Sequence, residues 1–517
     1  MEVELLLVTL GFALSMIFYI SNTRIKKRPK HPLPPGPAGF PLIGCLPEMM
    51  INKPTFRWMH NYMQRLNTEI ACFRLGVVNA VTITSPELAR QFLKEHDAVF
   101  ASRPDIMSAR LVSNGYLSTV LAPAGDQWKK MRRVMVSEVL ATAVHEWLHP
   151  KRCEEADHLI RYVCNQCRKN GTVNVREAAR LYCGGMIRKL MFGDRLLGRG
   201  TEDGGPGFEE RQHMDALFTI LSYTYGFAIA DFILCLHWFD LDGHKRVVTN
   251  ALECLRKYHE PIIHNRVEMW RNGVRNTNQD ILDVLISLKD SNNDRLLSIQ
   301  EIKAQVIEIL AAAVDNPSNA VEWALAEMMN EPRLLELATK ELDDIVGRKR
   351  LVEESDLCEL NYSKACIKEA FRLHPVAAFN LPHVSTADTI VGGYMISKGS
   401  HVMLSRMGVG RNPRIWEDPL KFKPERHLAV ADEDEAVELN DPELRMLSFG
   451  SGRRGCPAVK LGSTMTTILL ARLIQGFKWR PPSNIHLLES HNDLFMAKPL
   501  ISGAIPRLEP QVYHRLL

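Results

Sequence analysis

The sequence predicts a mainly α-helical fold with small β-sheets, and two observations carry this prediction. Apolar residues recur at steps of three and four residues, the period of a helix with one buried face, in ten stretches of the chain. These stretches are 86–96, 126–142, 152–169, 174–192, 211–230, 245–272, 299–330, 332–346, 361–373 and 461–475. Strand-like stretches are fewer and shorter, and they lie near 69–75, 78–84, 388–396 and 400–404.

The composition fits a large globular body and excludes several other classes. Of the 517 residues, 46% are hydrophobic and 24% charged, which argues against a disordered chain and against a multi-span membrane protein. The net charge of +4 is too weak over this length to indicate a nucleic-acid partner. Eleven cysteines in so long a chain indicate free thiols in a cytosol-facing body. Because no change in composition marks a later boundary, we expect one domain over 45–517.

The N-terminal end differs from this body. Leu5–Ile20 carries no charge, and five basic residues follow it between Arg24 and Lys30. The run is slightly shorter than the about 17–25 apolar residues of a membrane span, but its neighbours can extend it. By the positive-inside rule, the basic side and everything after it stay in the cytosol. A cleaved signal peptide is the alternative, but its basic residues would precede the apolar run. We therefore expect an uncleaved membrane anchor over 1–23.

A proline-rich segment follows this predicted anchor. Residues 32–37 read PLPPGP, and Gly39, Pro41 and Gly44 come soon after. Proline fixes φ and cannot continue a helix. The basic and proline-rich stretch 24–44 is therefore predicted to be a stiff, extended hinge between the anchor and the body.

The strongest candidate for chemistry is Cys456, which lies in the loop sequence FGSGRRGCPA over 449–458. Glycines allow such a loop to curl around one atom with its N–H groups pointing inward. The loop's two arginines and the N-terminus of the helical segment that follows favour a thiolate over a thiol. A thiolate held in this way suits a metal ligand. A lone cysteine is more often a small buried apolar residue, so the interpretation depends on other features.

Two further groups of residues strengthen it. Glu369 and Arg372 are three residues apart and share a helix face, and Arg426 could close a buried carboxylate–guanidinium network with them. Trp128 and Arg132 are four residues apart and would offer an indole N–H and a guanidinium to one carboxylate. Each pair alone would be an ordinary surface contact.

In this order along the chain, the motifs resemble those of the cytochrome P-450 family of haem-thiolate monooxygenases, over essentially the whole chain. The resemblance implies the cytochrome P-450 fold and haem b, iron protoporphyrin IX, as the cofactor. It implies that Cys456 is the thiolate ligand of the iron, within the pattern Phe449-x-x-Gly452-x-Arg454-x-Cys456. A thiolate ligand favours cleavage of the O–O bond, while the protein orients the substrate.

The same resemblance assigns other residues. Arg454, Trp128 and Arg132 match positions that bind the haem propionates, and His383 stands where an arginine commonly meets a propionate. Glu369, Arg372 and Arg426 match a buried triad that is structural and not catalytic.

Several departures from the family's usual pattern narrow the resemblance. In the run AAVDNP over 312–317, Asn316 replaces a threonine that helps proton delivery, and Asp315 and Asn316 are the predicted catalytic residues. Pro317 should free the carbonyl of Ala313 and kink the helix. Together with His383, His427 and SRMGVGRNP over 405–413, these departures resemble the plant amino-acid N-monooxygenases.

That narrower resemblance implies a reaction. An α-amino acid, with phenylalanine or tryptophan favoured, is N-hydroxylated twice and then loses water and carbon dioxide to give an aldoxime, a precursor of glucosinolates and related compounds. O2 and a partner, NADPH–cytochrome P-450 reductase, are implied, at the endoplasmic reticulum membrane. Three alternatives stay open: an isomerase or dehydratase that needs no reductase, a C-hydroxylating plant cytochrome P-450, and a non-catalytic haem sensor.

The substrate pocket is less well defined by the sequence. A carboxylate is best bound by an arginine, and Arg103 in FASRP is a candidate, although its alternative role is structural. By position, the pocket should draw on five segments: 105–125, 216–226, 312–316, 377–381 and 494–495. His259 and His264 are five residues apart with a proline between them, so they do not form a zinc motif. Cys164 and Cys167 lack a second cysteine pair and are most simply free thiols.

Overall fold

The computed structural model describes residues 11, 31–195, 197–224, 226–233, 240–428, 436–482 and 484–516. Apart from Gly11, the predicted anchor over 1–23 lies outside the described residues, and so do residues 24–30 of the predicted hinge. Among the described residues, no helix combines the length and the apolar character needed to cross a membrane.

All ten stretches with helical periodicity contain helix, so the mainly helical prediction is confirmed. They are α4 (Pro86–Arg90) with η1 (Gln91–Glu95), α6 (Asp126–Val134) with η2 (Met135–Val139), α8 (His149–Asn170), α9 (Val175–Phe192), α10 (Phe208–Thr224), α11 (His244–Arg271), α13 (Ile299–Asn330), α14 (Pro332–Ile345), α15 (Asn361–Leu373) and α17 (Val459–Gly476). Because α13 continues through Pro317, the proline interrupts its hydrogen bonding without ending it.

Short helices and turns were missed because they have too few turns to display a period. The helices are α2 (Leu46–Ile51), α3 (Thr55–Arg65), α5 (Met107–Val112), α7 (Thr142–Trp147), α12 (Ile281–Ser287), α16 (Arg406–Gly410) and α18 (Pro510–His514). The 3₁₀ turns are η3 (Ile229–Asp231), η5 (Glu354–Asp356), η6 (Pro424–His427) and η7 (Gly452–Arg454).

The strands form small sheets, as predicted. The four-stranded sheet has the order β1-β2-β7-β4, with β2 and β7 parallel and the other pairs antiparallel. Its strands are β1 (Ile70–Leu75), β2 (Val78–Ile83), β7 (His401–Leu404) and β4 (His383–Val384). β5 (Thr389–Val391) and β6 (Tyr394–Ile396) form a hairpin. A third sheet, β3-β9-β8, was not predicted, and it joins Thr172–Asn174, Ile501–Pro506 and Phe477–Arg480.

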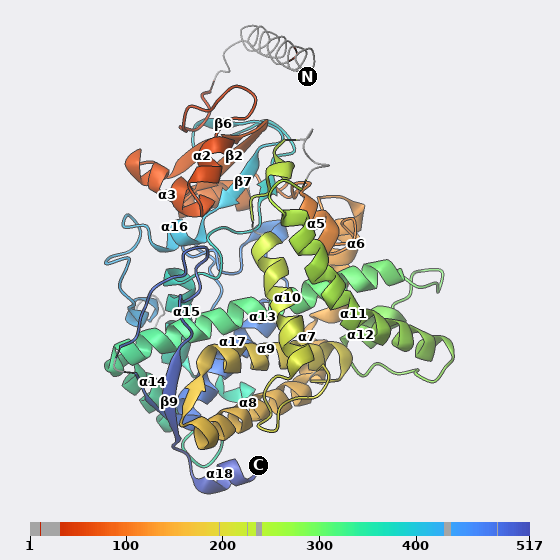
Figure 1. The fold of residues 1–517 in the computed structure, drawn as a ribbon, viewed down its shortest axis with the longest axis vertical. Coiled ribbons are helices and arrows are strands. Elements are labelled where there is room, and N and C mark those ends of the chain that lie inside the picture. The colour runs from red at the N-terminus through yellow and green to blue at the C-terminus, as the bar shows by residue number, and fades with distance from the viewer. Residues whose placement is uncertain are drawn as a thin grey trace, which may run out of the picture.

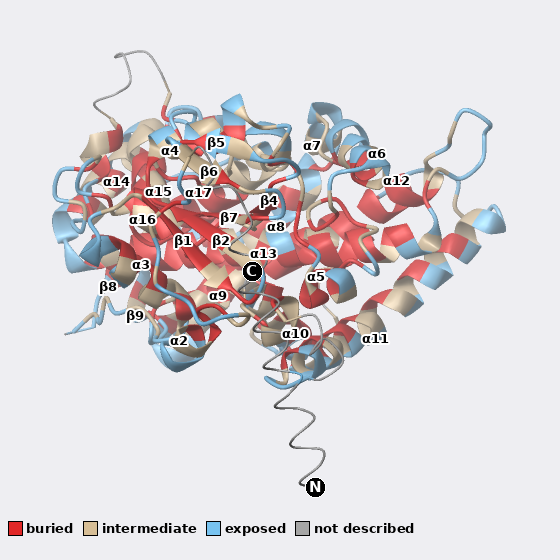
Figure 2. Cartoon of the chain, turned by 90° about the horizontal axis from the view of Figure 1, so that it is seen from above, coloured by how far each residue is buried: buried red, intermediate tan, exposed pale blue. Residues whose placement is uncertain are grey.

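The largest core packs α8, α9, α13, α15 and α17 against one another (Figure 1). Helix α13 crosses the molecule and is buried along most of its length, whereas α11 is buried on one face and exposed on the other (Figure 2). A buried helix such as α13 contacts elements on all sides. It therefore gives the site a rigid wall.

The described part of the predicted hinge is bonded to the body. The carbonyl of Pro32 accepts a hydrogen bond from Met395 N at 2.8 Å, and that of Pro35 from Cys72 N at 2.8 Å. A Cβ on Gly36 would lie 1.8 Å from the carbonyl oxygen of Cys72, so the close approach to β1 requires glycine. From Pro32 onward, the chain therefore follows the sheets and does not stand apart as a free spacer.

Candidate active site

A cavity of about 270 Å³ lies between α13, the start of α17 and the segment after α15. It brings together most of the side chains that the sequence predicted for the site. Its lining includes Cys456, Arg454, Trp128, Arg132, His383, Phe449 and Asn316. Two other predicted residues, Asp315 and Gly452, are not part of this lining.

The loop that carries Cys456 is closed at its base by a backbone hydrogen bond. Cys456 N donates to the carbonyl of Phe449 at 2.8 Å, and Ala458 N, just before α17, donates to Cys456 Sγ at 3.4 Å. Gly452 has φ +69°, and a Cβ there would lie 2.3 Å from the carbonyl oxygen of Leu93. Gly452 therefore shapes the loop and does not contact the cavity.

The thiol of Cys456 is not activated by the loop's own arginines. Burial raises its pKa, while the N–H of Ala458 and the charge of Arg132 act in the opposite direction. Arg453 pairs with Asp97 at 3.2 Å, and Arg454 donates to backbone carbonyls. The expectation that these two arginines favour the thiolate is not confirmed, because the charges that lower the pKa of Cys456 are those of Arg132 and Arg406. A thiolate here needs the positive charge of a bound metal.

Trp128, Arg132 and Arg454 form a cationic corner of the cavity. The guanidinium of Arg454 lies 4.2 Å from the centre of the Trp128 ring and donates to the carbonyls of Ala101 at 2.5 Å and Ala122 at 2.7 Å. Burial, followed by the charge of Arg103, lowers the pKa of Arg454 to about 8. Within the part of the chain that the structure describes, Arg132 and the indole N–H of Trp128 have no partner. This corner therefore favours an anion.

His383 reaches the same cavity from β4. Burial and then the charge of Arg103 hold its pKa well below the usual range, so the ring is neutral. Its Nδ1 lies 2.7 Å from the carbonyl of Phe100 and donates to it, which leaves Nε2 as an acceptor. His383 could donate to a propionate only after taking up a proton.

One face of α13 forms the opposite wall. Glu308, Ala312 and Asn316 line the cavity at steps of four residues, and this spacing alone could have identified Glu308, which the sequence analysis missed. The buried Glu308 carboxylate accepts hydrogen bonds from the loop before α6. The donors are Ser118 Oγ at 2.5 Å, Thr119 N at 3.0 Å, Val120 N at 2.9 Å and Leu121 N at 3.4 Å.

Arg103 holds this loop from the other side. Its guanidinium donates to the carbonyls of Val120 at 3.3 Å, Leu381 at 2.6 Å and Pro382 at 3.0 Å. Arg103 lines the cavity, but these bonds favour the structural alternative over a role as carboxylate anchor. Loop 118–121 is therefore held by the Glu308 carboxylate through its N–H groups and by the Arg103 guanidinium through the carbonyl of Val120.

Asp315 lies on a different side of α13 from Asn316. It is buried, its Oδ1 has no hydrogen-bond partner in the described structure, and burial raises its pKa to about 7 against the opposing charge of Arg180. Asn316 contacts the cavity directly. Of the two predicted catalytic residues, the structure places one at the site and the other one residue away from it, in the protein interior.

Three of the five predicted pocket segments contribute residues to the lining, namely 105–125, 312–316 and 377–381. The expectation for 216–226 and 494–495 is wrong for this cavity. Phe218 and Phe495 contact each other with ring centres 6.3 Å apart, and Arg180 lies 3.8 Å from the ring centre of Phe218. These side chains bury their apolar surface against one another and not against the cavity.

Other cavity residues were missed because nothing in the sequence singles them out. His374 follows α15 and stacks on Trp323 with ring centres 3.8 Å apart, and its Nε2 lies 2.8 Å from Glu327. Its Nδ1 has no partner, nor do the side-chain amide of Asn319 and the hydroxyl of Ser448, within the described residues. All three side chains line the cavity, which therefore offers several unused hydrogen-bonding groups.

The predicted triad residues meet behind the cavity. Arg372 donates to both oxygens of Glu369 at 2.7 and 2.8 Å, and Arg426 donates to the same carboxylate at 3.0 Å. His427, which the sequence analysis did not include in the triad, lies 2.8 Å from it. Burial raises the carboxyl pKa, but the bonds from Arg372 and His427 outweigh it and lower the pKa to about 2. Lys423 N completes the network at 2.9 Å.

The residues present fit the haem that the sequence resemblance implies. Cys456 would supply the thiolate ligand of the iron, and Trp128 and Arg132 would bind propionates with donors that no other described residue uses. A half-buried guanidinium without an anion is unfavourable, and a propionate would relieve that cost.

Comparison with known proteins agrees with this geometry. The family model for cytochrome P-450 matches residues 34–502. The chain is 52% identical to isoleucine N-monooxygenase 1 of Lotus japonicus, over 96% of this chain and 94% of the relative. It is 52% identical to phenylalanine N-monooxygenase of Arabidopsis thaliana, over 93% and 92% of the two chains. It is 53% identical to tyrosine N-monooxygenase of Sorghum bicolor, over 93% and 87%. On this evidence the chain belongs to the cytochrome P-450 family of haem-thiolate monooxygenases.

Proposed function

We propose that the protein converts an α-amino acid to its aldoxime by two successive N-hydroxylations. The observation that carries this proposal is the identity of about one half, over almost the full length, to relatives named as amino-acid N-monooxygenases. Each hydroxylation would consume one O2, two electrons and two protons, and would release one water. The N,N-dihydroxy acid would then lose carbon dioxide and a further water.

The haem, bound through Cys456, would supply the oxidising chemistry. The chain's own residues would bind the substrate and exclude water. Burial in the cavity, together with the positive charge of Arg406 in its wall, would favour the neutral amine that N-hydroxylation requires. Arg406, which donates to Asn380 Oδ1, is a candidate for meeting the carboxylate, because Arg103 is bound to carbonyls. Asn316 could hold a water by its amide but cannot itself give up a proton near neutral pH.

The comparison with relatives does not determine which amino-acid side chain the substrate carries. Their names include both aliphatic and aromatic amino acids at nearly equal identity to this chain. The preference for phenylalanine or tryptophan therefore stays a prediction. A competition assay with equal concentrations of isoleucine, valine, phenylalanine, tyrosine and tryptophan would rank them by the aldoximes formed.

The decisive experiment reconstitutes the full, haem-loaded chain with a plant NADPH–cytochrome P-450 reductase and offers each protein amino acid. We expect an aldoxime that keeps the ¹⁵N of a labelled substrate and takes its oxygen from ¹⁸O2, with two NADPH consumed per product. Omission of the reductase should stop the reaction. No aldoxime from any amino acid would overturn the proposal.

Two alternatives predict different results in the same assay. An isomerase or dehydratase would turn over without reductase and without NADPH. A C-hydroxylating enzyme would give a product that keeps its carboxylate, so no labelled carbon dioxide would leave a substrate labelled at C1.

We also propose that residues 1–23 anchor the protein in the endoplasmic reticulum membrane with the body in the cytosol. The support is the uncharged run Leu5–Ile20 and the basic residues that follow it. A chain without residues 1–30 should leave the membrane fraction and still bind haem. Retention of that chain in membranes would contradict the proposal.

A further inference from the structure

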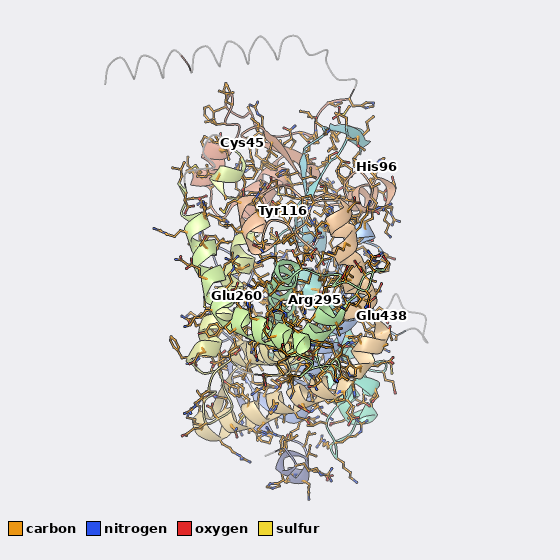
Figure 3. The ribbon with its side chains drawn as sticks, turned by 90° about the vertical axis from the view of Figure 1, so that its right-hand side faces the viewer. Cys45, His96, Tyr116, Glu260, Arg295 and Glu438 are labelled. Carbon is orange, nitrogen blue, oxygen red and sulfur yellow. The ribbon has the colours of Figure 1, made fainter. Side chains whose placement is uncertain are left out.

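A second cavity, of about 190 Å³, lies away from the haem site between α5, α11 and α13. Its apolar floor is formed by Val112, Ile263 and Ile307, all buried. Its rim carries charge. Figure 3 labels Glu260, one of the rim residues, on α11 at the face of the molecule turned toward the viewer. The cavity therefore combines an apolar base with a charged entrance.

The buried wall of this cavity contains His259, the end of a chain of hydrogen bonds. Arg188, a donor only, lies 3.4 Å from His213 Nδ1, which must therefore accept. His213 Nε2 lies 2.7 Å from His259 Nε2. Since burial holds the pKa of His213 well below its usual range and lowers that of His259 to about 3, both rings are neutral.

These constraints fix both tautomers. With its Nδ1 accepting, neutral His213 carries its proton on Nε2 and donates it to His259 Nε2. His259 must then carry its own proton on Nδ1. Nδ1 of His259 is buried and has no hydrogen-bond partner in the described structure. The wall of the cavity thus contains an N–H donor without an acceptor, which is unfavourable unless a ligand or water supplies one.

The rim adds an unpaired cation. Arg256, one helical turn before His259 on α11, makes no ion pair or hydrogen bond with any described residue. Lys303 and Glu260 pair with each other at 3.2 Å across the entrance. Two cations and one carboxylate leave an excess of one positive charge. The missing partner is therefore an acceptor with one negative charge.

We propose that this cavity binds a small carboxylate with an apolar tail, placed with its carboxylate between Arg256 and His259 Nδ1 and its tail on Val112, Ile263 and Ile307. Such a ligand satisfies the unused donor, balances the charge of the rim and covers the apolar floor. Water would satisfy His259 alone. The site is independent of the proposed function, because helix α13 separates it from the haem cavity.

The ligand could be an amino acid or a simple carboxylic acid, and the two share the chemistry that the site recognises. An amino acid would place its ammonium group near Glu260, in competition with Lys303. We therefore choose three matched probes: L-leucine, 4-methylpentanoate, which lacks the amine, and 3-methylbutylamine, which lacks the carboxylate.

The test is equilibrium dialysis of each radiolabelled probe against the full, haem-loaded chain, with the Soret band recorded in parallel. We expect both carboxylate probes to bind without a change in the Soret band, and we expect no such binding of the amine. Arg256→Ala should weaken carboxylate binding about tenfold to a hundredfold, and Arg256→Lys should weaken it less. Lys257→Ala removes the same charge from the neighbouring exposed position of α11 and should leave the affinity unchanged.

Tighter binding of leucine than of 4-methylpentanoate would identify an amino-acid site, and the reverse order a site for simple acids. The proposal would be overturned if neither carboxylate binds, if the amine binds equally well, or if Arg256→Ala has no effect. Binding of a probe in the haem cavity shifts the Soret band, whereas binding in the second cavity leaves it unchanged. Failure of the proposed function can therefore be distinguished from failure of the second site.

Discussion

Two groups of buried polar side chains beside the haem cavity differ in how fully their atoms are paired. Around Glu369, each carboxylate oxygen has partners, and the three nitrogens of Arg372 donate to the carboxylate and to the carbonyls of Gly410, Pro419 and Lys421. In the cavity wall, the amide of Asn319 and Nδ1 of His374 have no partner within the described residues, and neither has Oδ1 of Asp315, which is buried outside the lining.

The difference separates structure from function. A buried charge network that is complete within the protein holds elements together and has nothing left with which to bind a ligand. Unpartnered polar atoms in a cavity wall cost free energy in the absence of ligand, and they are retained where a cofactor, substrate or water uses them. The comparison therefore predicts that changes in the Glu369 network lower stability, whereas changes at the cavity alter binding and the response to pH.

The largest effect is expected at Cys456, where the two regions meet. Phe371 of α15 packs against Phe449 of the cysteine loop, with ring centres 5.8 Å apart. Cys456→Ser should remove the thiolate and with it the characteristic absorbance of the reduced, carbon-monoxide-bound protein. Cys358→Ser, at an exposed thiol, is the control and should keep that absorbance. A normal spectrum from Cys456→Ser would refute the ligand assignment.

The next largest effect tests the paired region. Glu369→Ala leaves Arg372 and Arg426 without their carboxylate, and breaking a buried pair costs about 3–5 kcal/mol. We expect a much lower yield of haem-loaded protein and a lower temperature for loss of the Soret band. Glu369→Gln keeps one acceptor oxygen and should lie between the wild type and the alanine variant. A Glu369→Ala variant as stable as the wild type would show that the network is not structural.

Sequence reasoning located those parts of the site that are encoded locally. Glu369 and Arg372 lie within one helical turn, as do Trp128 and Arg132, and the loop around Cys456 is a single short motif. The ten periodic stretches contain helices for the same reason, since the helical period of each is carried within its own sequence.

The parts that sequence reasoning missed depend on distant pairing. Glu308 accepts a hydrogen bond from Ser118, which is 190 residues away in the chain. Strand β3 pairs with β9, which lies near the C-terminal end of the sequence. Strand β9 contains Gly503 and Pro506 and has no strand-like alternation. The segments around Phe218 and Phe495 were placed in the pocket by analogy, but their aromatic rings pack on each other. Local periodicity carries no information about such contacts.

A smaller effect is expected at Glu308, a cavity residue whose carboxylate is as fully paired as that of Glu369. Glu308→Ala should release loop 118–121 while the fold persists. The loss of a charge-assisted acceptor should speed amide exchange at Thr119, Val120 and Leu121 by about tenfold to a hundredfold. Ser118→Ala removes one of the donors and should change the exchange much less. Unchanged exchange in Glu308→Ala would mean that Arg103 and packing alone hold the loop.

The smallest effect concerns Asp315, whose unpaired, buried carboxyl should make stability depend on pH. Its pKa is raised from an ordinary 3.8 to about 7 by burial. Between these values the folded chain keeps a proton that the unfolded chain has lost. The stability that this proton contributes is therefore complete below about pH 4 and is lost as the pH rises through 7, with a slope of about 1.4 kcal/mol per pH unit.

Asp315→Asn holds no titrating proton, so the stability difference between wild type and variant should fall with rising pH and level off above about 7. The change between pH 5 and pH 8 should be on the order of 2 kcal/mol, measured from urea unfolding at each pH. Asp315→Ala is the matched control, because it differs from Asn in packing but should give the same pH-dependent part. A difference that stays constant from pH 5 to pH 8 would mean that Asp315 finds a partner in the holoenzyme. In that case this residue would belong with the paired, structural group and not with the unpaired side chains.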